Sequence, residues 1–375
     1  MLLELLSCHK RLAVCQELVS DSLHTHNSIL GSELFTIQCT KWHITLKKTS
    51  VITTINRFEQ TFVASLTNRN YTVIVVADLK TPIDSWNREN IILVHDNGMR
   101  KWKRLARLLP YNHYCRKNLG YLYAADAGAG SILETDDDND LTSDINCWKH
   151  LEFKTVFGSQ YPNILTEFTE HPIWARGYPL ELVNTDQTKL LFDTNKEELE
   201  RVGVVQSLVN GDPDVDAIFR LTSPHYSTNT RFSPNKGFLF PSGTYTQGNT
   251  QATLWPKPEL YHLTYIPATV SFRFCDILKM YVAQRCMWEY GDQMAVVSPF
   301  FRQERNVHDF MSDFKSEDSM YHCVHDLLAR VLPSIKLKGQ IDDLVVVYKR
   351  LAREGIVEPG ELTIVKTWVK AFEKL

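Results

Sequence analysis

The sequence lacks a basic excess and long apolar runs, and each absence excludes a class of protein. Its 375 residues carry 41 Lys and Arg against 44 Asp and Glu, a formal net charge of −3. Nucleic-acid-binding proteins normally show a basic excess or a basic stripe, so no nucleic-acid partner is expected. No apolar stretch reaches the roughly 18 residues of a membrane-crossing helix, so no membrane span is expected in this chain.

Familiar catalytic and metal-binding motifs are also missing. The eight cysteines form no CxxC pair, which argues against a structural zinc site and leaves disulfides open. There is no Walker A sequence, GxSxG, HExxH, internal repeat or low-complexity segment. With 43% hydrophobic and 23% charged residues, the chain can nevertheless bury a sizeable core.

Short apolar runs alternate with helical patterns in the first half of the chain. This alternation predicts a parallel, Rossmann-like sheet flanked by helices. The predicted strands are 50–55, 71–77, 90–94 and 131–134, and the predicted helices between them are 57–67 and 118–129.

The rest of the chain divides into helical ends and a loop-rich middle. An amphipathic helix is predicted over 1–23, another helix over 273–290, and three helical stretches from about 309 onward. Short strands and loops are predicted over 172–179, 214–221 and 237–240.

Three consecutive aspartates, Asp136, Asp137 and Asp138, follow the predicted strand 131–134. Ligands of parallel sheets bind beyond the carboxyl ends of the strands. Crowded carboxylates are tolerated where a cation neutralises them, and Mn²⁺ or Mg²⁺ commonly uses one or two carboxylates together with substrate phosphates. Strand alternation would direct Asp136 and Asp138 to one side and Asp137 to the other, which predicts a D-x-D metal site. A solvated acidic turn is the alternative.

An EF-hand calcium loop is excluded by the residues that follow. Its sixth position requires glycine and here holds Leu141, and its twelfth requires glutamate and here holds Cys147.

Several segments, in the same order, resemble the STELLO family, plant Golgi proteins with a glycosyltransferase domain. A more distant similarity is to the reversibly glycosylated polypeptides, which act on UDP-arabinose. The segments that resemble the STELLO family are SVITTIN (50–56), TVIVVADLKTP (72–82), RKNLGYLYAADAGAGSILETDDDN (116–139), HPIWARGYPLE (171–181), DVDAIFRL (214–221) and PATVSFRFCDILKMYVAQRCMWEYG (267–291).

The resemblance implies a GT-A glycosyltransferase fold, an α/β fold with a Rossmann-like, mostly parallel sheet flanked by helices. The implied organisation is a helical N-terminal extension over 1–47, a GT-A-like domain over 48–308 and a helical C-terminal extension over 309–375. The resemblance also implies the Golgi lumen; because no membrane anchor or signal is found in this chain, the compartment is left unassigned and a cytoplasmic location stays open.

By the same resemblance, one set of residues holds the nucleotide sugar and the metal. Asp78 would bond the base, which favours uracil, and Asp136 and Asp138 would hold the ribose and a Mn²⁺ or Mg²⁺ ion. Turn capping for Asp78 and surface charge for Arg116 and Lys117 are the alternatives. The nucleotide-sugar-binding set is Thr53, Thr54, Ile55, Asn56, Asp78, Arg116, Lys117, Asp136 and Asp137.

A second set serves catalysis and the acceptor. Asp276 lies near the start of a predicted helix and is the expected general base, with Glu289 and Asp292 as the alternatives. Arg273 could pair with Asp276 or with phosphate. The acceptor-side candidates are Trp174, Arg176, Asp214, Asp216 and Arg273.

The resulting expectation is a metal-dependent glycosyltransferase that moves a sugar from a nucleotide sugar, by default a UDP-sugar, to an acceptor hydroxyl with inversion. The acceptor class is open among glycans, proteins and lipid-linked molecules, and a homodimer is not excluded. A nucleotide-sugar mutase and a non-catalytic scaffold that retains the fold are the alternative functions.

Overall fold

The computed structural model describes residues 47–88, 91–95, 101–185, 191–193, 196–304 and 309–375. The predicted helix 1–23 and all but the last residue of the N-terminal extension lie outside these residues.

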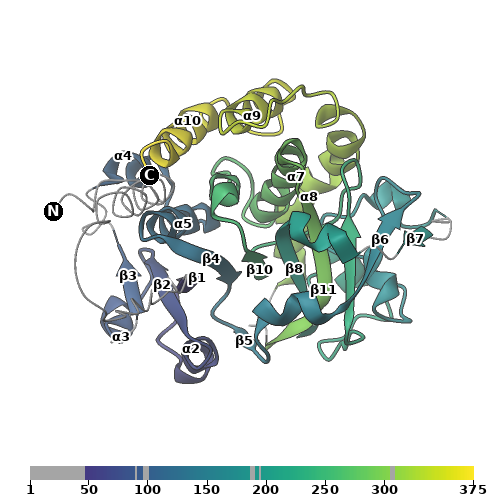
Figure 1. The fold of residues 1–375 in the computed structure, drawn as a ribbon, viewed down its shortest axis with the longest axis horizontal. Helices are drawn as coiled ribbons and strands as arrows, with labels where there is room; N and C mark the ends of the chain where they lie inside the picture. The colour runs from purple at the N-terminus through teal and green to yellow at the C-terminus, as the bar shows by residue number, and fades with distance from the viewer. Residues whose placement is uncertain (1–46, 89–90, 96–100, 186–190, 194–195, 305–308) are drawn as a thin grey trace, which may run out of the picture. The chain divides into compact units, whose positions relative to one another are not determined.

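Four parallel strands form one half of an eleven-stranded sheet within the described residues (Figure 1). Their β-branched and aliphatic side chains are buried, as expected for parallel strands covered on both faces. This arrangement confirms the predicted α/β class with a Rossmann-like parallel sheet. In sheet order the four strands are β3 (Ile91–Val94), β2 (Tyr71–Ala77), β1 (Lys47–Thr54) and β4 (Ala129–Thr135).

The second half of the sheet contains both parallel and antiparallel pairs. β10 joins it to β4 in antiparallel register, whereas β8 and β11 pair in parallel. Only one of its strands, residues 237–240, was predicted. Continuing the sheet order, the strands are β10 (Ala252–Trp255), β8 (Val202–Gly211), β11 (Gln293–Gln303), β9 (Lys236–Phe240), β6 (Glu152–Phe157) and β7 (Leu191–Asp193), with β5 (Asn139–Leu141) beside β11.

Short helices connect the parallel strands, and α5 packs most closely against the sheet. The predicted helices 57–67 and 118–129 correspond to α2 and α5. Gly120 of α5 lies so close to β1 and β2 that an added Cβ would be 2.5 Å from Val51 Cγ1 and 2.6 Å from Val76 Cγ2. The helices of this half are α2 (Gln60–Thr67), α3 (Ile83–Trp86), α4 (Lys103–Leu108) and α5 (Lys117–Asp126).

Of the segments predicted as loops and short strands in the middle of the chain, 214–221 was assigned wrongly. Residues 214–221 enter a helix, α6 (Ala217–Thr222), because Asp216 caps it: Asp216 Oδ1 accepts the Phe219 N–H at 2.8 Å. Residues 172–179 form turns and no strand. The 3-10 helices are η2 (Tyr114–Arg116), η3 (Ile145–His150), η4 (Ile164–Glu167), η5 (Leu180–Leu182), η6 (Lys196–Arg201), η7 (Pro258–Thr264) and η8 (Trp288–Tyr290).

Helices dominate the last hundred residues, as predicted. The helix predicted over 273–290 is α7 (Cys275–Met287), which is buried along its whole length, followed by η8. The three helical stretches of the tail are α8 (Phe310–Asp326), continued by a π-helical turn (Leu327–Val331), α9 (Asp343–Arg353) and α10 (Glu361–Phe372).

The C-terminal helices share one hydrophobic cluster with the sheet and α7. Tyr265 packs edge-on against Tyr348 of α9 and at a tilt against Trp368 of α10. Glu361 is fully buried, and its carboxylate accepts hydrogen bonds from the Tyr265 hydroxyl and from the Ala268 and Thr269 N–H groups. This tail is therefore packed into the fold.

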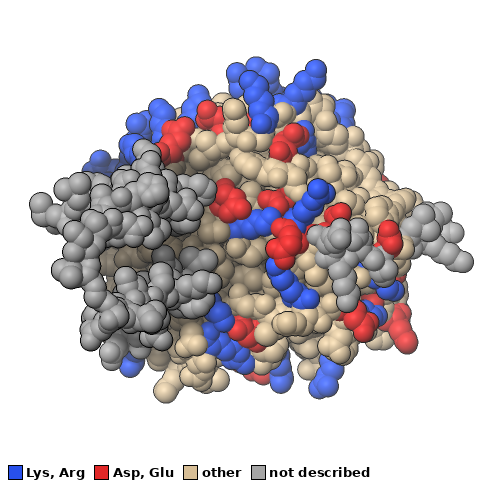
Figure 2. Space-filling model, viewed as in Figure 1, with Lys and Arg blue, Asp and Glu red and all other residues tan. Residues whose placement is uncertain are grey.

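The surface shows no segregation of charge on the face drawn in Figure 2, where acidic and basic side chains are interspersed. Among the described helices, none combines the length and the apolarity that crossing a membrane requires.

Replacing Gly120 by alanine tests the close approach of α5 to the sheet. The new methyl group would overlap Val51 and Val76, so Gly120→Ala should lower the free energy of unfolding by about 1–3 kcal/mol despite the better helix propensity of alanine. Chemical denaturation measures the change. Gly360→Ala is the control, because an added Cβ there meets nothing within 4 Å. Equal stability of the two variants would contradict the packing.

His262 should make the fold sensitive to acid. Burial lowers the pKa of His262 from 6.5 to about 4. The unfolded chain therefore binds this proton more readily, so stability should fall by up to about 3 kcal/mol as the pH drops from 6.5 to 4. Unfolding free energies across this range should depend less on pH in His262→Gln than in the wild type. Parallel pH profiles for the two proteins would refute this assignment.

Candidate active site

A cavity of about 510 Å³ opens where the carboxyl ends of β1, β2 and β4 meet the loops around α6 and α7. It brings together twelve of the residues singled out in the sequence, from six separate segments. These residues are Thr53, Thr54, Ile55, Asn56, Asp78, Asp136, Asp137, Asp138, Arg176, Asp214, Arg273 and Asp276.

Asp136 is held by a lysine buried beneath the cavity. Lys117, the first residue of α5, is fully buried and donates to Asp136 Oδ1 at 3.2 Å and to the carbonyl groups of Thr135 and Thr250 at 2.7 and 3.2 Å. Burial raises the pKa of Asp136 to about 6; Lys117 opposes the shift and Asp138 adds to it. Lys117 therefore supports the acidic segment from below and does not itself line the cavity.

Asp137 turns toward the loop that follows β1. Its Oδ2 accepts hydrogen bonds from the Thr54 hydroxyl and from Asn56 Nδ2, the latter at 2.9 Å. The first loop and the aspartate segment are thereby fixed to one another.

Asp138 turns instead toward the end of β11. Asn139 Nδ2 donates to its Oδ1 and Gln303 Nε2 to its Oδ2, both at 3.0 Å. The predicted alternation, with Asp137 facing away from Asp136 and Asp138, is wrong. Residues 137–138 form a turn, and all three aspartates line the cavity.

Asp78 has the turn-capping role that was the alternative to base binding, although it also lines the cavity. Its Oδ1 accepts the Leu79 N–H at 2.6 Å and its Oδ2 the Asn112 N–H at 2.7 Å, while its own N–H donates to Thr81 Oγ1. Asp78 thus connects the end of β2 to the loop that precedes α5.

The donor set is suited to a divalent cation that is completed by a ligand. Six carboxylates and three cationic side chains line the cavity, a formal excess of three negative charges. In the part of the chain that the structure describes, no three His, Cys, Asp or Glu side chains form a group that could hold a metal ion by themselves. Mg²⁺ and Mn²⁺ sites of one or two carboxylates are normally completed by water and substrate phosphates. Asp136 and Asp138 offer oxygen ligands of that kind.

Arg176 links two more of the carboxylates that line the cavity. Its guanidinium donates to both oxygens of Asp276 at 2.9 and 2.8 Å and to both oxygens of Asp214 at 2.9 and 3.0 Å. Asn249 Nδ2 adds a hydrogen bond of 2.7 Å to Asp214 Oδ2. Asp276, in the first turn of α7, is thereby held at the cavity surface.

Arg273 pairs with Glu317 of α8 and not with Asp276, one of the two partners considered for it. Nε and Nη2 of Arg273 donate to Glu317 Oε1 at 2.8 and 2.6 Å. Glu317 is fully buried, and its Oε2 accepts the Ala217 N–H at 2.8 Å and the Tyr321 hydroxyl.

In addition to Lys117, the candidates Arg116, Glu289, Trp174 and Asp216 do not line the cavity. Arg116 is buried and donates to the Ala106 and Leu109 carbonyls, so the surface-charge alternative does not describe it either. Glu289 pairs with Arg285 one helical turn away at 2.7 Å. Trp174 Nε1 donates to Asp216 Oδ2 at 2.6 Å, and Asp216 caps α6.

An aromatic corner of the cavity was missed in the sequence. Phe272 is 46% exposed and packs against Tyr114 with ring centroids 4.3 Å apart, while His113 meets it edge-on. Burial lowers the pKa of His113, which favours the neutral ring. These three residues carry no recognisable motif, and only the fold brings the loop before η2 next to the loop before α7. The other lining residues that were missed are Lys80, Asn112, Gln251 and Gln303.

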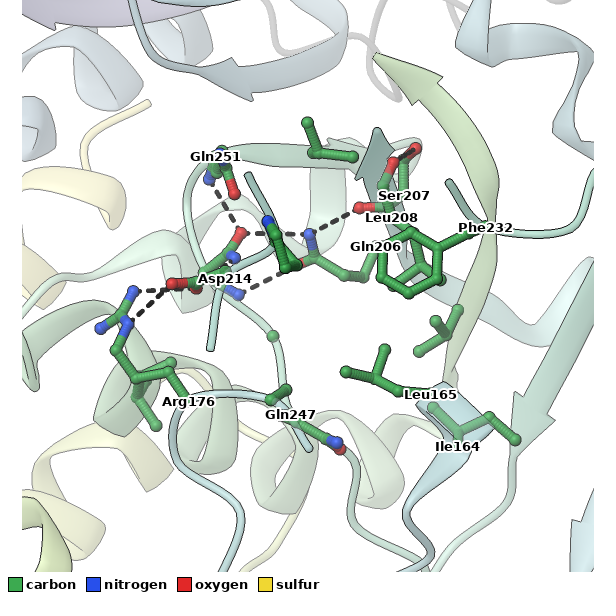
Figure 3. A pocket seen from close by; sticks show the side chains of 17 residues that line it. Ile164, Leu165, Arg176, Gln206, Ser207, Leu208, Asp214, Phe232, Gln247 and Gln251 are labelled. Carbon is green, nitrogen blue, oxygen red and sulfur yellow. Dashed lines mark hydrogen bonds and ion pairs between the residues drawn. The ribbon is translucent and has the colours of Figure 1, made fainter. Parts of the chain in front are cut away.

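A smaller cavity of about 50 Å³ lies behind Arg176 and Asp214 (Figure 3). Arg176 reaches Asp214 across one side, and Gln206 bonds Asn249 at 3.1 Å on another. Ile164, Leu165 and Phe232 supply an apolar side. The two cavities share Arg176, Asp214 and Gln251, so these polar side chains form the partition between them.

Comparisons with known proteins point to one group of relatives. No family model matches the chain. The chain is 26% identical over 328 residues to "Probable glycosyltransferase STELLO1" of Arabidopsis thaliana, a match covering 80% of this chain and 41% of the relative. It is 28% identical over 263 residues to "Probable glycosyltransferase STELLO2" of the same plant, covering 62% of this chain and 32% of the relative. The chain thus spans less than half the length of the curated relatives that it matches.

Both relatives carry the name of the family that the sequence motifs resemble. The chain is therefore similar to two STELLO proteins over 80% and 62% of its own length.

Proposed function

We propose that this protein is a metal-dependent glycosyltransferase that uses a nucleotide sugar, with UDP-sugars as the first class to test. The observation that carries the proposal is the single cavity that gathers the first loop, the aspartate segment and Asp276. The names of the two relatives support the reaction class. The donor, the metal and the stereochemical outcome are part of the proposal.

The charge of the cavity supports the need for a cation. A nucleoside diphosphate is an anion, and a wall with a formal excess of three negative charges would repel it. Arg176 cannot offset this, because Asp214 and Asp276 already occupy its guanidinium. When bound at Asp136 and Asp138, a divalent cation would neutralise the diphosphate and make it a better leaving group.

The residues of the chain would orient the donor from two sides. Thr53 and Ile55 border the cavity on the first loop, while the Asp137 contacts to Thr54 and Asn56 hold this loop against the aspartate segment. Asp78 and Asn112 border the same side. This wall is the proposed place of the nucleoside.

Asp276 is the proposed general base on the opposite wall. A base must reach the proton of the attacking hydroxyl, and Asp276 borders the cavity at the start of α7. Arg176 orients both of its oxygens. Oδ1 also accepts the Ile277 N–H at 3.0 Å, so Oδ2 is the oxygen with a second lone pair for an acceptor hydroxyl. Attack assisted by this base, on the face of the sugar opposite the leaving diphosphate, would invert the anomeric centre.

Asp138→Asn should weaken manganese-dependent binding of UDP by at least roughly tenfold, because one charged oxygen ligand becomes a neutral amide. Calorimetry with UDP, with and without Mn²⁺, measures this. Asp140→Asn is the control, since Asp140 is exposed and lies outside the cavity two residues further on. UDP binding that persists unchanged in a chelator would contradict a metal-dependent site.

Asp276→Asn should reduce turnover roughly 10²–10⁴-fold while leaving the UDP affinity within a factor of about two, because a general base acts on the acceptor. Hydrolysis of a UDP-sugar, with water as acceptor, provides the assay, and proton NMR of the first sugar released reports its anomeric configuration. Glu289→Gln is the control. Retention of configuration would remove Asp276 from this role, and isomerisation of the donor without any acceptor would indicate a mutase.

A further inference from the structure

Arg273 is a cavity residue with one guanidinium nitrogen that has no hydrogen-bond partner among the described residues. Its Nε and Nη2 are engaged by Glu317, whereas Nη1 forms no hydrogen bond with any described residue. Arg273 lines the cavity, although only 8% of the residue is exposed.

The other cationic groups on this side are already saturated. Arg176 donates through Nε, Nη1 and Nη2 to Asp214, Asp276 and the Arg273 carbonyl. Lys117 has three oxygen partners beneath the cavity. A guanidinium with one free edge is the group best suited to bind a phosphate oxygen.

Glu317 fixes the plane of that guanidinium from outside the predicted catalytic domain. Two N–H groups of Arg273 share its Oε1, and Asp313 adds a longer contact of 3.7 Å. Oε2 is anchored separately, by the Ala217 N–H and the Tyr321 hydroxyl. One oxygen of the Glu317 carboxylate therefore bonds the cavity arginine, and the other bonds neighbouring groups of the fold.

We propose that Arg273 binds a phosphate of the donor through Nη1, and that Glu317 of α8 is the positioning residue that aims it. This inference rests on the proposed function for the identity of the donor. The C-terminal helices would then contribute to the binding site, because α8 orients the guanidinium of Arg273, which is distant from it in sequence.

The test compares ligands with and without phosphates. In the presence of Mn²⁺, Glu317→Gln should weaken binding of UDP and of inorganic pyrophosphate roughly tenfold and leave uridine unaffected, because only the phosphate contact is lost. Isothermal calorimetry measures the three affinities. Arg273→Lys should show the same selectivity, because it keeps the charge and loses the fork of donors.

Two further variants separate positioning from general destabilisation. Tyr321→Phe removes a partner of Oε2 and leaves Oε1 on Arg273, so it should lower thermal stability without changing UDP affinity. In an Arg273→Ala background, Glu317→Gln should have no further effect on UDP binding, because the two residues act through one contact.

The outcomes distinguish the two proposals. Equal weakening of uridine and UDP in Glu317→Gln, or additive losses in the double variant, would overturn the positioning role while leaving the proposed function intact. Binding of pyrophosphate that depends on Glu317, in a protein that binds no nucleoside diphosphate, would overturn the proposed donor and support the anion site.

Discussion

The candidate site depends on the three neighbouring carboxylates at 136–138, each of which is hydrogen-bonded by a different part of the fold. Asp136 is held by Lys117 of α5, Asp137 by the loop after β1, and Asp138 by Asn139 and by Gln303 of β11. Each carboxylate therefore has its own hydrogen-bond donors before any ligand enters. The pKa of Asp136 is nevertheless raised to about 6, first by burial and then by the neighbouring Asp138 and Asp137, although Lys117 opposes the shift.

These hydrogen bonds also connect the two halves of the sheet at one edge. α5 and β1 belong to the parallel half, whereas β11 belongs to the mixed half, and the aspartate turn contacts all three. A change in the packing of either half would therefore move one carboxylate relative to the other two. The helix α5 begins with Lys117, which bonds Asp136, and packs closely on the sheet where Gly120 lies against Val51 and Val76. The packing of α5 therefore also fixes the position of this lysine.

The sequence was sufficient for those parts of the fold whose pattern is local. Continuous β-branched runs such as residues 71–77 predicted buried strands, and the polar residues at their ends border the cavity. Residues 214–221 were misassigned because a segment of eight residues that mixes apolar and charged positions does not distinguish a strand from a helix. The capping role of Asp216 decides for the helix. The partners of Arg176 and Arg273 were beyond sequence reasoning, since Asp276 and Glu317 lie 100 and 44 residues away from them.

The C-terminal helices illustrate why a boundary drawn from composition says little about function. A polar, helical tail suggests an appendage, yet Glu317 and Glu361 are both fully buried and both accept hydrogen bonds from the segment 265–273. A buried carboxylate without partners would cost several kcal/mol, so these contacts hold the tail and that segment to one another. Because the segment leads directly into Asp276, the geometry of the proposed base and of Arg273 depends on helices from the far end of the chain.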